Sequence, residues 1–200
     1  MNLYSNTDAA KLERLILNSS VLEPIIRQWS RISLPDCWLA AGAIAQTVWN
    51  DAFNLAANHG LSDIDLVYFD PTDLSEDGEA KQAARIRREF AHLGSKIDVK
   101  NEARVHLWYA QKFGHEIAPY ISTPHAIATF PTTATAIGIQ PVASGLSISA
   151  PFGLSDLLGT IVRPNKTQIT RATYEAKIAR WKPLWPCLEI IEWADEQGDI

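Results

Sequence analysis

The segment Leu61-Ser-Asp-Ile-Asp-Leu-Val-Tyr-Phe-Asp70 carries two acids within an otherwise apolar strand pattern. Side chains alternate across a strand, so we expect Asp63 and Asp65 on one face and Ile64 and Leu66 on the other. The strand rise sets the two carboxylates about 6.6 Å apart, where they repel by roughly 2.5 kcal/mol at an effective dielectric constant of about 20. A divalent cation, a basic partner or a retained proton would offset this repulsion. The alternative is that Asp63 caps a turn and Asp65 points into solvent.

The composition sets broad limits on the class of protein. The chain has 200 residues, 46% of them hydrophobic and 20% charged, which is typical of one soluble globular domain. No apolar run of about 18 residues and no signal-peptide pattern occur in the sequence, so we expect neither a membrane partner nor secretion. Cys37 and Cys187 are too few for a disulfide framework, which favours a cytoplasmic location. The net charge of −5 argues against binding to duplex DNA.

A glycine turn precedes the acidic strand. Residues 37–41 form a short apolar run, Gly42 follows, and residues 43–53 show the periodicity of a helix. The N-terminus of a helix presents free N–H groups that can hold an anion, and glycine permits close approach. The alternative is a plain strand-to-helix turn without a ligand.

A third acid occurs in the next predicted strand. Residues 96–100 alternate, and Asp98 shares a face with Lys96 and Lys100. An acid flanked by lysines on a strand is the second unusual feature of the sequence.

The helix predicted after this strand offers further polar groups. Lys100 and Arg104 can neutralise phosphate charge, and Asn101 or His106 can contact a base or sugar. The alternative is that Asn101 only caps the helix, His106 pairs with Glu102, and the two basic residues are solvated.

The order of elements predicts an α+β fold with a small mixed sheet flanked by helices, followed by a C-terminal β-hairpin and helices. We expect N-terminal helices that pack on the core over residues 1–34, the core itself over 35–120, and an extension of the same domain over 121–200. In that extension, the hairpin strands are expected at 135–142 and 146–150, the last helix at 168–181, and a frayed acidic tail at 189–200.

Three carboxylates from two neighbouring strands would form an oxygen-rich site suited to Mg²⁺ or Mn²⁺. Such a site can bridge nucleotide phosphates and activate an acceptor hydroxyl, with Asp98 also placed to act as base. The helix N-terminus after Gly42 would hold the β- and γ-phosphates.

The order Gly42, Asp63-Ile-Asp65, Asp98 resembles the nucleotidyltransferase superfamily of the DNA polymerase β type. Longer strings resemble a family of small bacterial nucleotidyltransferase-like proteins, over roughly residues 35–186. These strings are AGAIAQTVWN (41–50), DIDLVYFD (63–70), VKNEARVHLW (99–108), FPTTATA (130–136), APFGLSDL (150–157) and VRPN (162–165).

The resemblance implies that Asp63 and Asp65 are metal ligands, that Asp98 is the third acid, and that Gly42 and Ala43 form the phosphate-contacting turn. The superfamily usually has glycine or serine at the position of Ala43, so only backbone N–H donors remain there. The interval between Gly42 and Asp63 is also longer than usual.

The leading hypothesis is metal-dependent transfer of a nucleoside monophosphate from a triphosphate to an unknown acceptor, with release of pyrophosphate. The acceptor is a small molecule, an RNA end or a protein. The alanine after Gly42 favours an alternative, a catalytically silent module that binds a nucleotide or a partner. A metal-dependent phosphohydrolase that uses the same acids is a further alternative.

Overall fold

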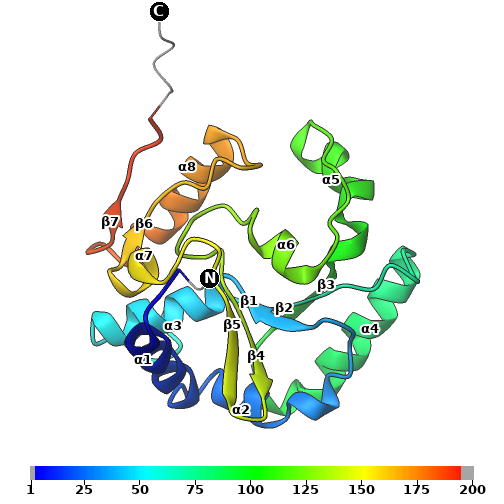
Figure 1. Ribbon diagram of the computed structural model, residues 1–200, viewed down its shortest axis with the longest axis horizontal. Helices are drawn as coiled ribbons and strands as arrows, with labels where there is room; N and C mark the ends of the chain where they lie inside the picture. Colours follow the sequence, from blue (N-terminus) through cyan, green and yellow to red (C-terminus); the bar gives the residue numbers. More distant parts are fainter. Residues whose placement is uncertain (1–2, 195–200) are drawn as a thin grey trace, which may run out of the picture.

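The computed structural model describes residues 3–194 and confirms the expected α+β fold. The main sheet has five strands in the order β3-β2-β1-β4-β5, with β2 and β3 parallel and the other pairs antiparallel. Helices lie against both faces of this sheet (Figure 1). The strands are β1 (Trp38–Ala40), β2 (Ile64–Tyr68), β3 (Ile97–Asn101), β4 (Gly138–Val142) and β5 (Gly145–Ser149).

The helices follow the apolar periodicity of the sequence. They are α1 (Asn6–Leu17), α2 (Glu23–Arg27), α3 (Gly42–Ala52), α4 (Glu76–Glu89), α5 (Val105–Phe113), α6 (Thr123–Ile127), α7 (Ser155–Leu158) and α8 (Arg171–Trp181). Three 3₁₀ turns, Trp29–Arg31, Ala91–Leu93 and Glu102–Arg104, and a parallel pair of short strands, β6 (Ile161–Val162) and β7 (Glu189–Ile190), complete the described elements.

Local signals set the helix ends. Ser75 caps α4, because its hydroxyl accepts a hydrogen bond from the backbone N–H of Gly78. Acids fill the first turn of this helix, and Arg87 and Arg88 lie in the last turn, which complements the helix dipole.

One face of the sheet forms the main core with α1, α3 and α4. The inward residues of three strands alternate with those of the other face, as the sequence pattern predicts. The buried side chains on this face include Leu39, Ile64, Leu66, Ile97, Val99, Ile16, Trp49 and Ile86.

A tryptophan cluster joins α8 and the segment after it to α3. The ring of Trp49 makes edge contacts with Trp181 and Trp185, each with ring centroids 5.4 Å apart. The indole N–H of Trp185 donates to Oδ1 of Asn50 at 2.7 Å. The C-terminal part of the chain is therefore anchored in the main core.

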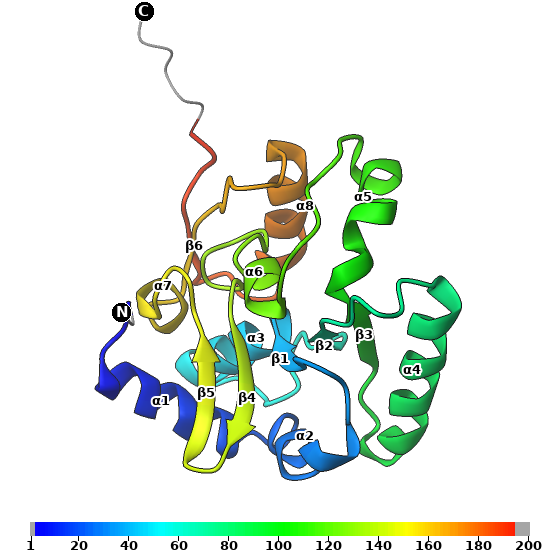
Figure 2. The same ribbon diagram turned by 45° about the vertical axis from the view of Figure 1, so that its right-hand side comes forward.

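The other face of the sheet meets α5, α6 and α8. Two smaller apolar clusters lie here, one around Trp38, Val67 and Ile127 and one around Val105 and Tyr109. Figure 2 shows α5, α6 and α8 together on this side. This is the face on which the alternation of β2 and β3 places the acids.

The hairpin formed by β4 and β5 extends the main sheet, because β4 pairs with β1 through Leu39 and Ala40. The sequence predicts the hairpin but not this pairing. A Cβ at Gly138 would lie 2.5 Å from Cδ1 of Ile127, so a larger residue here would require the Ile127 side chain to move.

The acidic tail is only partly described. Glu189 and Ile190 form β7 instead of fraying, while residues 195–200 of the predicted tail lie outside the described residues. In the described part of the chain, no helix combines the length and the apolarity that crossing a membrane requires.

Candidate functional site

The parallel pair β2 and β3 brings the three predicted acids to one face of the sheet. Asp65 and Asp98 are register partners on these strands, and Asp63 directly precedes β2. The alternation predicted for Asp63 and Asp65 places both next to one cavity.

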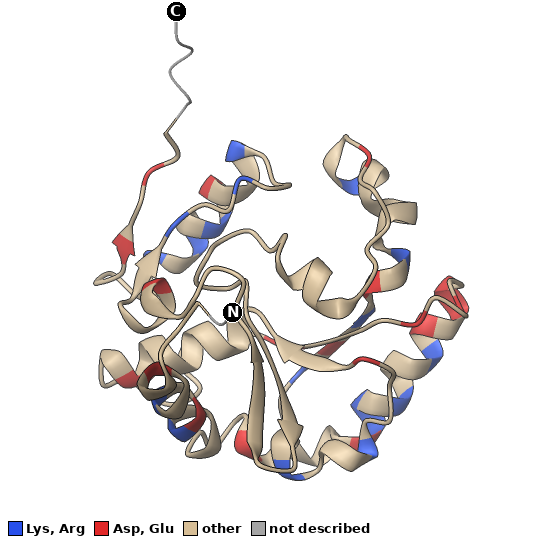
Figure 3. Cartoon of the chain, in the orientation of Figure 1, with Lys and Arg blue, Asp and Glu red and all other residues tan. Residues whose placement is uncertain are grey.

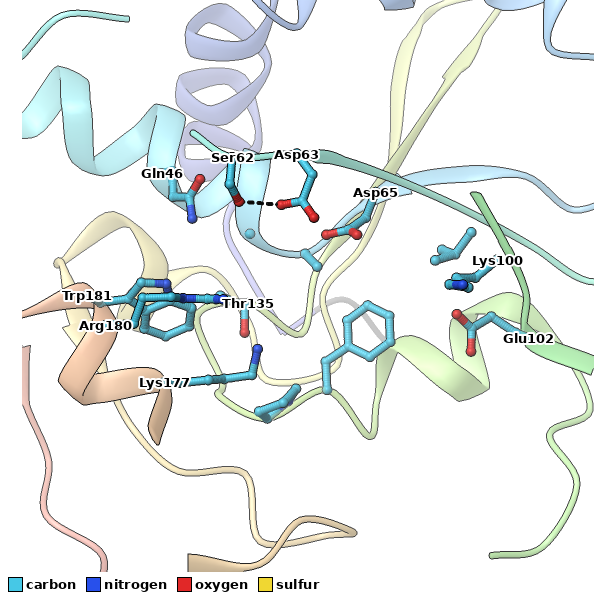
Figure 4. Close-up of a pocket in the computed structure, with 15 residues that line it drawn as sticks. Gln46, Ser62, Asp63, Asp65, Lys100, Glu102, Thr135, Lys177, Arg180 and Trp181 are labelled. Atoms are coloured by element: carbon cyan, nitrogen blue, oxygen red, sulfur yellow. Dashed lines mark hydrogen bonds between the residues drawn. The ribbon is translucent and has the colours of Figure 1, made fainter. Parts of the chain in front are cut away.

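The cavity beside these acids has a volume of about 240 Å³. Figure 4 shows Asp63 and Asp65 directed into it from one side, with Lys177 and Arg180 opposite. Its walls come from the start of α3, from β2 and β3, from the loop after α6 and from α8. The lining residues are Ala41, Gly42, Gln46, Ser62, Asp63, Asp65, Val67, Lys100, Glu102, Phe130, Pro131, Thr135, Lys177, Arg180 and Trp181.

Asp65 lines this cavity without a direct partner for its carboxylate in the part of the chain that the structure describes. Within residues 3–194, its carboxylate has no hydrogen-bond or ion-pair partner, whereas Asp63 accepts a hydrogen bond from the hydroxyl of Ser62 at 2.5 Å. Burial first, then the charges of Asp63 and Asp98, raise the pKa of Asp65 to about 7. A bound cation would relieve this repulsion.

A basic wall faces the acids from α8. Figure 3 shows basic residues along α8. Lys177 and Arg180 are spaced i, i+3 and therefore lie on one side of this helix. Desolvation and the neighbouring Arg180 lower the pKa of Lys177, although Asp65 and Asp63 oppose this shift. Among the described residues, neither side chain forms an ion pair; both lie over the ring of Trp181, at 5.5 and 5.9 Å from its centroid.

These two cations have no counterpart among the residues predicted from the sequence. The sequence does show two basic residues spaced i, i+3 and followed by Trp181, which indicates a basic side of the helix. It does not indicate that this side faces the acids, because the helix lies more than 100 residues after them. Only the fold brings them together.

Of the two residues predicted to form the phosphate-contacting turn, Gly42 lines the cavity and Ala43 does not. Ala41, not Ala43, lines the cavity next to Gly42. Ala43 is fully buried, and its carbonyl accepts from the hydroxyl of Thr47. Ala41 has φ 60° and ψ −130°, a conformation that favours glycine, so the backbone is strained beside the cavity.

Asp98 lies on the expected face but does not line the cavity. The guanidinium of Arg87 on α4 donates to the carboxylate of Asp98 at 3.2 Å and also to the carbonyl of Ile97. The structure therefore brings Asp63 and Asp65 together at the cavity and directs Asp98 toward the edge of the sheet.

Glu102 is the third carboxylate that lines the cavity. It is 6% exposed, and in the described part of the chain its carboxyl has no hydrogen-bond or ion-pair partner. Burial, then Glu79 and Asp65, raise its pKa to about 8, against the opposing charge of Lys100. The sequence-based alternative paired Glu102 with His106, and this pair does not form; Nδ1 of His106 is buried without a partner.

A family model described as Nucleotidyltransferase matches residues 27–190. The chain belongs to this nucleotidyltransferase family. Its fold also matches an NMR structure described as revealing a CCA-adding enzyme head domain, with a TM-score of 0.77 and 24% sequence identity. That match covers 92% of this chain and 96% of the other, and at this identity it shows a shared fold. No significant match is found among curated proteins.

Two of the predicted nucleotide-contacting residues instead stabilise the nucleotidyltransferase fold. The side chain of Asn101 is 1% exposed and donates to the carbonyls of Asp70 and Asp73. Arg104 forms a buried ion pair with Glu79 at 3.0 Å. Neither residue lines the cavity.

Lys100 does reach the cavity of the nucleotidyltransferase. Its ammonium lies 3.9 Å from Oε1 of Glu79 and is about half exposed, so it is available to a ligand. Of the five residues predicted to contact the nucleotide, the structure brings only Gly42 and Lys100 to the cavity.

The donor set of this nucleotidyltransferase site fits a magnesium ion. In the described chain, no group of three or more His, Cys, Asp and Glu side chains is arranged to hold a metal. Mg²⁺ at nucleotide sites takes one or two carboxylates and completes its shell with water and substrate phosphates. Asp63 and Asp65 meet that requirement, since among residues 3–194 the Asp65 carboxylate has no hydrogen-bond or ion-pair partner.

Proposed function

We propose that the protein is a metal-dependent nucleotidyltransferase that moves a nucleoside monophosphate from a triphosphate to an acceptor hydroxyl. One observation carries this proposal: Asp63 and Asp65 face Lys177 and Arg180 across a cavity of about 240 Å³, and within the described part of the chain no ion pair joins the two walls. A cavity with separate acidic and basic walls suits a ligand that is itself a metal-bound polyanion.

The basic wall and the start of α3 would hold the phosphates. Lys177 and Arg180 supply two positive charges, and Gly42 opens a helix of 11 residues whose first N–H groups have no intrahelical partner. Together they position the β- and γ-phosphates, which depart as pyrophosphate. The γ-phosphate end of the substrate is thereby fixed at the α3 side of the cavity.

The acidic wall would hold the metal. Asp63 and Asp65 are the proposed ligands, and a bound Mg²⁺ would neutralise charge on the phosphates and lower the pKa of the acceptor hydroxyl. The acceptor oxygen forms a bond to the α-phosphorus, and the bond from that phosphorus to the bridging oxygen of the β-phosphate breaks.

Glu102 is the proposed proton acceptor. It lines the cavity on the β3 side, where burial and the charges of Glu79 and Asp65 favour its protonated form in the metal-free protein. A cation bound at Asp65 would offset one of these charges and favour the ionised form of Glu102, which can accept a proton. It takes the proton of the acceptor hydroxyl as that oxygen attacks. Asp98, the base expected from the sequence, is engaged by Arg87.

The metal site is tested by thermal unfolding with MgCl₂ and a non-hydrolysable ATP analogue. We expect the analogue to raise the melting temperature of the wild type but not of Asp63→Asn/Asp65→Asn. A matched control, Asp51→Asn/Asp77→Asn, removes two exposed acids away from the cavity and should respond like the wild type. Equal shifts in the wild type and in the Asp63/Asp65 variant would overturn the proposal.

The strained turn favours one alternative, a catalytically silent nucleotide-binding module. Ala41 adopts a glycine-like conformation beside the cavity. This strain limits how the backbone of the turn can adjust its N–H groups to a phosphate. Incubation with the four triphosphates and a cell extract separates the two functions. Pyrophosphate release supports transfer, binding without release supports the silent module, and orthophosphate without a labelled acceptor supports a phosphohydrolase.

A further inference from the structure

A second cavity adjoins the first. It has a volume of about 420 Å³, within the range of small-molecule sites, and lies between α5, α6 and α8. Both cavities are lined by the same five residues at their junction: Lys100, Glu102, Phe130, Pro131 and Lys177. The second cavity is thus a continuation of the first beyond Glu102, on the side away from α3.

Aromatic side chains form much of this second cavity. Trp108, Tyr109 and Phe113 follow one another along α5, and the Tyr109 and Phe113 rings have centroids 4.5 Å apart. The ammonium of Lys112 lies 5.4 Å from the Trp108 centroid and 5.3 Å from that of Phe113. Such a wall favours a planar ring that stacks on its aromatic faces.

The polar groups of the cavity are fixed by internal hydrogen bonds. Tyr120 shares a hydrogen bond with Thr129 at 2.8 Å and also bonds the side chain of Gln168. These bonds hold the side chains of Tyr120, Thr129 and Gln168 in fixed positions. The charged groups that remain are Lys100, Lys112, Lys177 and Glu102, three cations against one acid.

The geometry of phosphoryl transfer indicates which part of the reaction lies here. The attacking and leaving oxygens are roughly in line across the transferred phosphorus. If pyrophosphate leaves toward Gly42 and Arg180, which line only the first cavity, the acceptor approaches from the opposite side, with Lys177 at the boundary between the two cavities. That side is the junction at Glu102 and the aromatic cavity behind it, whereas the nucleoside is attached off this line.

We propose that the aromatic cavity seats the acceptor, and that the acceptor is a small molecule with a planar aromatic ring, a hydroxyl and an anionic group. The ring stacks on Trp108 and its neighbours, the anion is balanced by the lysines, and the hydroxyl points to Glu102. The assignment of this cavity to the acceptor rests on the proposed function.

Three matched probes test the chemistry of the cavity by calorimetric titration. 4-Hydroxyphenylacetate has the aromatic ring and the anion, tyramine exchanges the anion for a cation, and trans-4-hydroxycyclohexylacetate has a saturated, non-planar ring in place of the aromatic one. We expect the first to bind at least about tenfold more tightly than the other two, because it alone satisfies both the stacking and the charge.

Variants locate the binding. Trp108→Ala should weaken 4-hydroxyphenylacetate by about fivefold or more and Lys112→Gln by about threefold, while the controls Leu107→Ala and Lys81→Gln should stay within about twofold of wild type. Leu107 neighbours Trp108 but is 57% exposed, and neither control residue lines the cavity.

Equal binding of the three probes, preference for tyramine, no detectable binding, or no effect of Trp108→Ala would overturn the proposal. Competitive displacement of 4-hydroxyphenylacetate by adenosine would also overturn it, by assigning the cavity to the nucleoside. Failure of the proposed function appears separately, as Mg²⁺–tripolyphosphate binding that is unchanged in Asp63→Asn/Asp65→Asn.

Discussion

Asp65 and Asp98 are register partners on the parallel strands β2 and β3, yet only Asp65 lines the cavity. The difference comes from Arg87 in the last turn of α4. Its guanidinium donates a hydrogen bond of 3.2 Å to the Asp98 carboxylate. The negative charge of Asp98 still acts on Asp65 and contributes to its raised pKa. Asp98 thus influences the site electrostatically, while Glu102 occupies the third position in the cavity wall.

The roles of the two acids can be separated by substitution. We expect Glu102→Gln to lower the rate of pyrophosphate release with ATP and cell extract by about 10²-fold or more, because a general base is lost. Asp98→Asn should lower the rate by less than about tenfold. If Asp98→Asn lowered the rate more than Glu102→Gln did, Asp98 and not Glu102 would be the general base.

The raised pKa of Glu102 makes stability depend on pH. Between its ordinary pKa of 4.5 and about 8, this group is protonated in the folded state and ionised in the unfolded state. The folded state binds more protons in that window, so the stabilisation is complete below about pH 4.5 and is lost as the pH rises toward 8.

We therefore expect the metal-free wild type to lose melting temperature relative to Glu102→Gln between pH 5 and pH 8. A differential of about 1 kcal/mol corresponds to roughly 2–4 °C for a domain of this size. The control is Glu116→Gln, which removes an exposed acid. Its melting temperature should change with pH in the same way as that of the wild type. A difference between wild type and Glu102→Gln that does not change with pH would contradict the prediction.

Lys177 is expected to contribute to phosphate binding. Lys177→Gln removes a cation from the basic wall and should weaken the binding of Mg²⁺–tripolyphosphate about tenfold, since a hydrogen bond to a charged group is worth about 1.5–3 kcal/mol. Lys182→Gln, at the exposed end of the same helix, should leave the affinity unchanged. Titration calorimetry on the two variants decides, and equal affinities would exclude Lys177 from the site.

The strain at Ala41 predicts a stabilising substitution. Ala41→Gly relieves the positive φ of 60° at the start of α3, and the gain exceeds the added entropy of the unfolded chain. We expect an increase in the free energy of unfolding of up to about 1 kcal/mol, measured by urea denaturation. Ala45→Gly, inside α3, should instead lose about 1 kcal/mol.

The sequence predicts best those features that depend on interactions between residues close together in the chain. Asp63 and Asp65 follow from the two-residue alternation of a strand, and the cap at Ser75 follows from hydrogen bonding within one turn. The hairpin follows from its turn residues. In each case the interacting groups lie within a few positions of one another.

Features that depend on packing between distant segments could not be predicted in the same way. Lys177 and Arg180 meet the acids only because α8 packs on the core, and Arg87 withdraws Asp98 only because α4 lies along β3. The sequence allows Asn101 either to contact a nucleotide or to cap a helix. Its side chain accepts from the N–H of Ala103, as a cap does, and also donates to two backbone carbonyls that the sequence gives no reason to place there.

The tryptophan cluster beneath the site has a consequence for how a substrate is received. Trp181, which ends α8 and lines the cavity, is packed against Trp49 of α3, and α3 also supplies Gly42. The cationic side chains and the helix start that faces them are therefore parts of one rigid body. We expect the distance between α8 and the start of α3 to be the same with and without substrate. Selection for the length of the triphosphate would then come from this fixed distance and not from the closing of a lid.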